Sequence, residues 1–180
     1  VRPIRFIIPF PPGGSTDPMG RFVAGKLTER LGQQVIVENR PGGNTVIGND
    51  VAAKATPDGY TMLYTGASFF STATLIPTLP YDTLRDFTGV GTISKSRSVL
   101  VVHPSVPVQS VQELIALAKA KPDQIKYGSS GHGTNTHLNG ELFRLHTGVD
   151  IRHIAYKGSG PVTTDLLGGR VGAYYSTPST

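Results

Sequence analysis

The stretch from Ile4 to Asp17, IRFIIPFPPGGSTD, contains a short apolar run, a turn rich in proline and glycine, and residues that favour the start of a helix. The run at 4–8 predicts a buried strand. Ser15, Thr16 and Asp17 are good N-cap residues, so the turn is expected to open directly into a helix. Backbone N–H groups at such a junction lack partners, and the helix dipole makes them favourable for an anion. The stretch therefore predicts a carboxylate site; a plain tight turn is the alternative.

Alternating strands and helices follow this stretch. Apolar residues at helical spacing predict a helix at 18–31, and QVIVE at 34–38 predicts a strand. A second helix is expected at 45–55 and a third strand at 60–65. This order implies parallel strands joined by right-handed crossovers, and therefore an α/β fold.

A second glycine-rich loop occurs later in the chain. A strand expected at 125–129 runs into GSSGHG at 128–133, and Thr134, Asn135 or Thr136 is expected to cap the next helix. In open α/β sheets such loops lie at the carboxyl ends of the strands, where ligands bind. If the chain has two lobes with one such loop in each, a ligand could be held from both sides.

Composition and spacing argue against several other classes of protein. The chain of 180 residues has a net charge of +5, but its 17 Lys and Arg residues are scattered, so we expect no nucleic-acid partner. It contains no cysteine, which excludes disulfides and thiolate metal sites. The histidines form no HExxH motif, and GSSGHG does not have the spacing of a dinucleotide fingerprint. We therefore expect neither a metal nor a cofactor.

Catalytic chemistry is also not expected. Ser15 and Ser129 could act as nucleophiles, but neither stands in a GxSxG motif. Asp17 could act as a general base, but a carboxylate that caps a helix and orients water is the simpler interpretation. We therefore assign no catalytic residue.

Five segments, taken together, resemble a known family. In chain order they are IIPFPPGGSTD, VENRPGGNTVIGNDVAAKATPDGYTML, VLVVHPS, KYGSSGHGTNTHLNGELF and YKGSGPVTTDLLGGRV. The chain resembles the substrate-binding receptors of tripartite tricarboxylate transporters, the TctC-like or Bug-type periplasmic proteins. The resemblance implies a periplasmic-binding-protein-like α/β fold (Venus flytrap, type II). It implies two lobes, each with a mainly parallel sheet flanked by helices.

The resemblance also implies a set of binding residues. In this family pattern, 13–17 hold a carboxylate partly through ordered water, and 129–135 close on the same group through backbone N–H groups and hydroxyls. Residues 66–68 make the other contact from the first lobe. The ligand-binding residues expected on this basis are Phe10, Gly13, Gly14, Ser15, Asp17, Gly66, Ser68, Ser129, Gly131, His132, Gly133, Thr134, Asn135 and Ser176.

Three of these residues carry separate expectations. Phe10 covers the apolar side of the ligand or belongs to the core. His132 faces the cleft or the solvent. Ser176 stands where relatives often carry an acidic residue, which favours a plain or aromatic carboxylate over an amino acid as the ligand.

The expected function is that of a periplasmic receptor, not an enzyme. It would capture a dicarboxylate, tricarboxylate or aromatic acid for the membrane permease of a tripartite tricarboxylate transporter. We expect a first lobe at 1–100 and a second lobe at 101–180. Because family members are commonly longer, the second lobe and its return crossover are expected to be incomplete, and exposed apolar faces could then favour self-association. The alternatives are a small α/β enzyme that binds a phosphate or acyl group at the same loops, and a fragment without a ligand.

Overall fold

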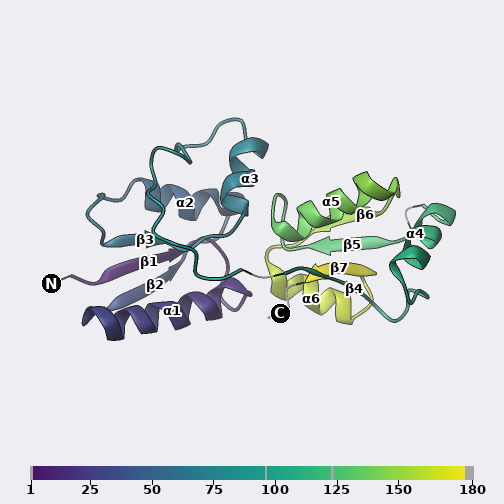
Figure 1. Cartoon of the computed structure of the whole chain (residues 1–180), viewed down its shortest axis with the longest axis horizontal. Coiled ribbons are helices and arrows are strands. Elements are labelled where there is room, and N and C mark those ends of the chain that lie inside the picture. The colour runs from purple at the N-terminus through teal and green to yellow at the C-terminus, as the bar shows by residue number, and fades with distance from the viewer. Residues whose placement is uncertain (1, 96, 123, 177–180) are drawn as a thin grey trace. The chain divides into compact units, whose positions relative to one another are not determined.

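The computed structural model describes residues 2–95, 97–122 and 124–176. The chain forms two compact units, Val1–Ile93 and Ser94–Thr180 (Figure 1). The boundary therefore precedes the expected one at 100/101, which falls inside a strand, Val99–Val102, that pairs entirely within the second unit. Each unit is described by itself below.

The first unit is built on a three-stranded parallel sheet. Its strands are β1 (Ile4–Ile8), β2 (Val35–Asn39) and β3 (Thr61–Leu63), in the order β2-β1-β3. Helix α1 (Thr16–Leu31) lies on one side of the sheet and α2 (Val46–Ala53) on the other (Figure 1). A short 3-10 turn, η1 (Gly43–Thr45), precedes α2, and α3 (Ser68–Leu75) follows β3. The parallel order expected from the sequence is confirmed.

The central strand β1 carries the core of the first unit. Phe6 and Ile8 pack with Ala24 of α1, and Ile7 is fully buried. A strand covered by helices on both sides is largely apolar. Four of the five residues of β1 are accordingly apolar, and Arg5 is the exception. Helix α1 approaches the strand closely at Gly20, where a Cβ atom would lie 2.4 Å from Cδ1 of Ile8.

The second unit contains a four-stranded mixed sheet. Its strands are β4 (Val99–Val102), β5 (Lys126–Ser129), β6 (Arg152–Ala155) and β7 (Ala173–Ser176), in the order β4-β7-β5-β6. Strand β5 pairs in parallel with β6 and β7, whereas β4 runs antiparallel to β7. Helix α4 (Val111–Ala120) precedes β5, α5 (Asn135–Thr147) follows it, and α6 (Ser159–Leu167) follows β6. The expected mainly parallel sheet is confirmed, with β4 as its antiparallel edge.

Two clusters of buried side chains stabilise this second sheet. One contains Tyr127, Leu114 and Ile151, and the other contains Val162 and Tyr174. Helices α5 and α6 cover opposite sides of the sheet (Figure 1). Within the described ranges, no helix is both long enough and apolar enough to cross a membrane.

Candidate functional site

The first candidate loop joins β1 to α1 and is organised by Asp17. This side chain is buried, although it lies in the first turn of a helix. Its carboxylate accepts hydrogen bonds from the Gly13 amide (3.0 Å), from Nε of Arg21 (3.1 Å) and from Nδ2 of Asn39 (2.9 Å). Asp17 therefore ties the loop to α1 and to the end of β2.

These bonds fix the charge of Asp17. Burial alone would raise the pKa of this carboxyl, but the hydrogen bonds from Gly13, Arg21 and Asn39 outweigh it and hold the pKa below its ordinary value. An ionised carboxylate with its lone pairs engaged is a poor general base. Gly13 lies before the helix, so its hydrogen bond to Asp17 stabilises the loop. The N-cap position of α1 is occupied by Ser15 and not by Asp17.

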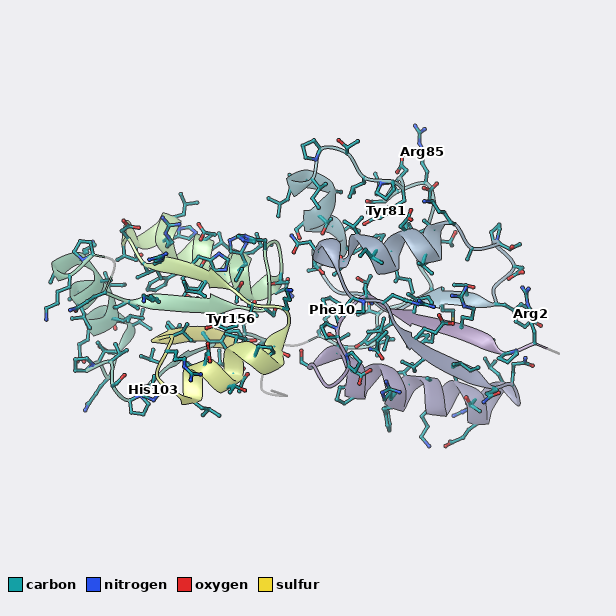
Figure 2. All side chains as sticks on the ribbon, turned by 180° about the vertical axis from the view of Figure 1, so that it is seen from behind. Arg2, Phe10, Tyr81, Arg85, His103 and Tyr156 are labelled. Atoms are coloured by element: carbon teal, nitrogen blue, oxygen red, sulfur yellow. The ribbon has the colours of Figure 1, made fainter. Side chains whose placement is uncertain are left out.

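Two loops meet at the same edge of the first sheet. Because β1 and β3 are parallel neighbours, their carboxyl ends bring 9–15 and 64–68 to one side. Phe10 lies at the end of β1 (Figure 2), half-buried against the Phe6 and Ile8 cluster, and its carbonyl accepts a hydrogen bond from Asn39. Within this unit Phe10 therefore packs against the core, which is one of the two alternatives that the sequence left open for it.

Ser68 is one of the buried polar residues of the first unit. It begins α3, and only 5% of its surface is exposed. Its hydroxyl has no hydrogen-bond partner among the described residues. A buried hydroxyl without a partner costs free energy, which a ligand or water placed beside it would recover. The Gly66 carbonyl, two residues earlier, accepts the amide of Phe69 and so fixes the turn into the helix.

The second candidate loop follows β5 and is closed by its own hydrogen bonds. The Ser129 hydroxyl accepts the Gly131 amide at 3.2 Å, and the Thr134 hydroxyl donates to the Gly131 carbonyl at 2.7 Å. Gly131 and Gly133 have φ angles of +136° and +71°, which L side chains rarely adopt. Thr134 is the N-cap of α5, as one of the sequence alternatives proposed, and its hydroxyl accepts the His137 amide.

The structure brings three histidines together at this loop. His132 lies in the loop, His137 on α5 and His153 on β6. The ring centroids are 5.2 Å apart for His132 and His137, 5.0 Å for His132 and His153, and 4.2 Å for His137 and His153. The Ser129 hydroxyl lies 2.6 Å from Nε2 of His153. The His132 ring is exposed at the surface of this unit, which agrees with either of its two alternatives.

The environment of the cluster favours the neutral form of its two half-buried rings, those of His137 and His153. Burial is the main cause that lowers the pKa of His153, to about 4, and the neighbouring histidines lower it further. Burial also lowers the pKa of His137, although the carboxylate of Glu141 acts in the opposite direction. Neutral imidazoles are the form that donates lone pairs.

Sequence reasoning missed His153 as a member of this cluster. The residue lies in a strand that is distant in sequence from the glycine loop, and no local motif connects the two segments. The only available signal was that consecutive βαβ units place their strands side by side, so that β6 would lie next to β5. The paired register, with Tyr127 opposite His153, shows this adjacency.

Ser176 ends β7, which is the other parallel neighbour of β5. The carboxyl ends of β5 and β7 therefore lie at one edge, and Ser176 shares this edge with the second loop. Asn135 is the first residue of α5 and is exposed. The expected site residues thus form two groups, one at the carboxyl edge of each sheet.

Comparison with known proteins identifies the family. Residues 19–180 match the tripartite tricarboxylate transporter family receptor, TctC. Protein BugT of Bordetella pertussis is 45% identical over 174 residues, which cover 96% of this chain and 53% of that protein. The chain belongs to the tripartite tricarboxylate transporter receptor family, a family of transport receptors rather than enzymes. The resemblance seen in the sequence is therefore confirmed.

Solved structures confirm the periplasmic-binding-protein-like fold. The R. palustris protein Rpa4515, solved with adipate, is 38% identical with a TM-score of 0.92, over 98% of this chain and 59% of that chain. MatC from Rhodopseudomonas palustris, solved with bound malate, is 25% identical with a TM-score of 0.88, over 98% of this chain and 60% of that chain. The chain spans about half the length of the curated relatives it matches.

Proposed function

We propose that this chain supplies the carboxylate-binding loops of a periplasmic solute-binding receptor that serves a tripartite tricarboxylate transporter. The observation that carries the proposal is the buried Ser68 hydroxyl, which has no partner among the described residues and lies at the same sheet edge as the Gly13–Asp17 loop. An anion at this edge would meet a helix N-terminus as well as this hydroxyl.

The charge of the first loop is compatible with an anionic ligand. Asp17 is negative, but Arg21 lies 3.1 Å from its carboxylate and offsets the charge. A ligand carboxylate would approach Gly14, Ser15 and Ser68, with ordered water between it and Asp17. Hydrogen bonds to a charged group contribute about 1.5–3 kcal/mol each, so a few of them are enough for micromolar binding.

The second loop would hold the ligand from the other unit. Its backbone N–H groups and the Thr134 hydroxyl lie at the N-terminus of α5, which favours a negative group. In this mechanism the two units close over the ligand as a hinge, and oriented backbone dipoles replace the water that the carboxylate loses. This convergence of the two loops is part of the proposal, as are the ligand contacts of Phe10, Gly131 and Asn135.

The proposed ligand is a dicarboxylate, a tricarboxylate or an aromatic acid. Relatives solved with adipate and with malate make the dicarboxylates the first candidates. Ser176 offers no negative charge for an amino group, which favours a plain carboxylate over an amino acid. We propose that the loaded receptor delivers its solute to the membrane permease of the transporter, and that self-association covers apolar surface left exposed.

Thermal-shift screening followed by calorimetry tests the proposal. Adipate, malate and benzoate are compared with glutamate and a phosphate monoester. We expect stabilisation by one or more of the first three without turnover. Stabilisation by the phosphate ester alone, or no stabilisation by any carboxylate, would overturn the proposal.

A pair of variants makes the test specific. Ser68→Ala removes a hydroxyl without breaking a side-chain hydrogen bond, so we expect an unchanged or slightly higher melting temperature and an affinity lower by about tenfold or more. Ser110 belongs to neither loop. Ser110→Ala removes the hydroxyl that caps α4 and should lower the melting temperature without changing the affinity. An unchanged affinity in Ser68→Ala would remove this residue from the site.

A further inference from the structure

Three imidazole side chains from three different segments form a compact cluster in the second unit. His132 comes from the glycine loop, His137 from the first turn of α5 and His153 from β6. One ring nitrogen from each residue lies within 4.8 Å of the corresponding nitrogens of the other two. Three nitrogen donors around one point are an arrangement that a packed core does not require.

We propose that His132, His137 and His153 form a binding site for a divalent transition metal of the zinc class, with a fourth coordination position left open. Imidazole suits zinc, copper and nickel, whereas calcium and magnesium prefer oxygen ligands. Three protein ligands and one open position are typical of zinc sites that accept a water or an exogenous ligand. The sequence alone indicated no metal site, because the three residues share no motif.

The atoms around the cluster support the orientation of the ligands. Nδ1 of His137 accepts the Gly133 amide at 3.0 Å, so this nitrogen carries the lone pair and Nε2 carries the proton. Nε2 lies 3.8 Å from a carboxylate oxygen of Glu141. A carboxylate beside the second nitrogen of a histidine is the usual support of a metal ligand, because it orients the ring and makes it more basic.

The carboxylate of Glu141 is itself held in position. It accepts a hydrogen bond of 2.6 Å from the hydroxyl of the buried Tyr127 and one of 2.9 Å from Arg144. A metal ion at Nδ1 of His137 would take the lone pair that now accepts the Gly133 amide. The N–H group at Nε2 would then be oriented by the carboxylate of Glu141. The chain thus provides a supporting partner before any metal is bound.

The three ring nitrogens must move closer together to bind one metal ion, because they now lie within 4.8 Å of one another. Zinc–nitrogen bonds of about 2.0–2.1 Å in a tetrahedral site place two nitrogens about 3.4 Å apart. His132 supplies the adjustment, because its ring is exposed and the residue lies between two glycines with positive φ. His137 and His153 are already stacked, with centroids 4.2 Å apart.

The test uses the untagged 180-residue chain after treatment with a chelator and dialysis. Zn²⁺ and Ni²⁺ are titrated by calorimetry, and Co²⁺ is followed by its visible absorption, which reports a tetrahedral site. We expect one ion per chain with micromolar or tighter affinity, and no comparable binding of Mg²⁺ or Ca²⁺. Absence of stoichiometric binding of all three transition metals would overturn the proposal.

Variants assign the ligands. His132→Gln changes an exposed side chain and should keep the fold, as circular dichroism will report, while weakening the metal affinity at least tenfold. His146→Gln is the matched control, since this exposed histidine on α5 lies outside the cluster, and it should bind as the wild type does. His153→Gln gives a second ligand variant, and if it does not fold, His132→Gln alone decides. Equal affinity in the wild type and in His132→Gln would refute the assignment.

Discussion

Asp17 is the residue on which the conformation of the first loop depends. Its buried carboxylate joins the Gly13 amide, the Arg21 guanidinium and the Asn39 amide. Sequence reasoning placed the residue at the helix start correctly, because Asp is common in first turns. It could not identify Arg21 and Asn39 as partners, since Asn39 comes from the end of another strand.

We expect Asp17→Ala to lower the free energy of unfolding by about 2–4 kcal/mol, because it removes the buried carboxylate that accepts hydrogen bonds from Gly13, Arg21 and Asn39. Urea denaturation measures the change. Glu29→Gln is the control on the same helix: it breaks an exposed pair with Lys26 and should change stability by less than about 0.5 kcal/mol. Equal effects of the two substitutions would contradict the role given to Asp17.

At the scale of elements, a cross-strand ion pair joins β1 to β2. Arg5 donates two hydrogen bonds, of 2.7 and 3.0 Å, to the carboxylate of Glu38. The hydrogen bonds from Arg5 are the main cause that lowers the pKa of Glu38 to about 2, with Arg40 adding to the effect. The folded chain therefore keeps this carboxylate ionised at a pH where the unfolded chain protonates it.

The stability that Glu38 contributes should be complete above about pH 4.5 and should disappear as the pH falls toward 2, since the unfolded state binds more protons in that window. Urea midpoints of the wild type and of Glu38→Gln, measured from pH 7 to pH 2, check this. The wild type should be the more stable protein at pH 7, and the difference should shrink through the window. A difference that does not vary with pH would contradict the assignment.

Close contact between a helix and a strand explains one glycine of α5. A Cβ atom at Gly140 would lie 2.2 Å from the ring of Tyr127, which is fully buried in β5. A Cβ atom added at Gly25 of α1 would have no neighbouring atom within 4 Å. The two glycines therefore look alike in sequence but differ in packing.

Alanine at these two positions should act in opposite directions. Gly140→Ala should lower stability by about 1–3 kcal/mol, because overpacking outweighs the better helix propensity of alanine. Gly25→Ala should raise stability by about 0.5–1 kcal/mol, because only the propensity changes. Thermal denaturation of both variants measures the signs, and a stabilised Gly140→Ala would show that α5 does not need this close approach.

The order of strands and helices could be predicted from the sequence, but parts of the sheet arrangement could not. Strands β1 and β2 are each marked locally by several apolar residues and by a following turn that contains proline and glycine. The antiparallel pairing of β4 with β7 joins Val99 to Ser176, and no local pattern reports a partner so distant in sequence. The histidine cluster was missed for the same reason, because it exists only once β6 pairs with β5.

At the scale of the whole molecule, the chain contains two units with separate cores. Phe6, Ile8 and Ala24 form the core of the first, and Tyr127 and Val162 belong to clusters of the second. Units with their own cores can unfold separately, so calorimetry should resolve two transitions. Asp17→Ala should shift one transition, and Gly140→Ala should shift the other.

These two transitions also provide a test of the proposed shared ligand. A dicarboxylate held by both loops is lost when either unit unfolds, so at a concentration of 100 times its Kd it should stabilise both transitions by up to about 2.7 kcal/mol. A ligand held only by the Gly13–Asp17 loop would raise the transition that Asp17→Ala lowers and leave the other unchanged. Scanning calorimetry with and without adipate and malate distinguishes the two outcomes. A shift of a single transition would disprove the convergence of the two glycine-rich loops on one ligand, while leaving carboxylate binding by the first unit intact.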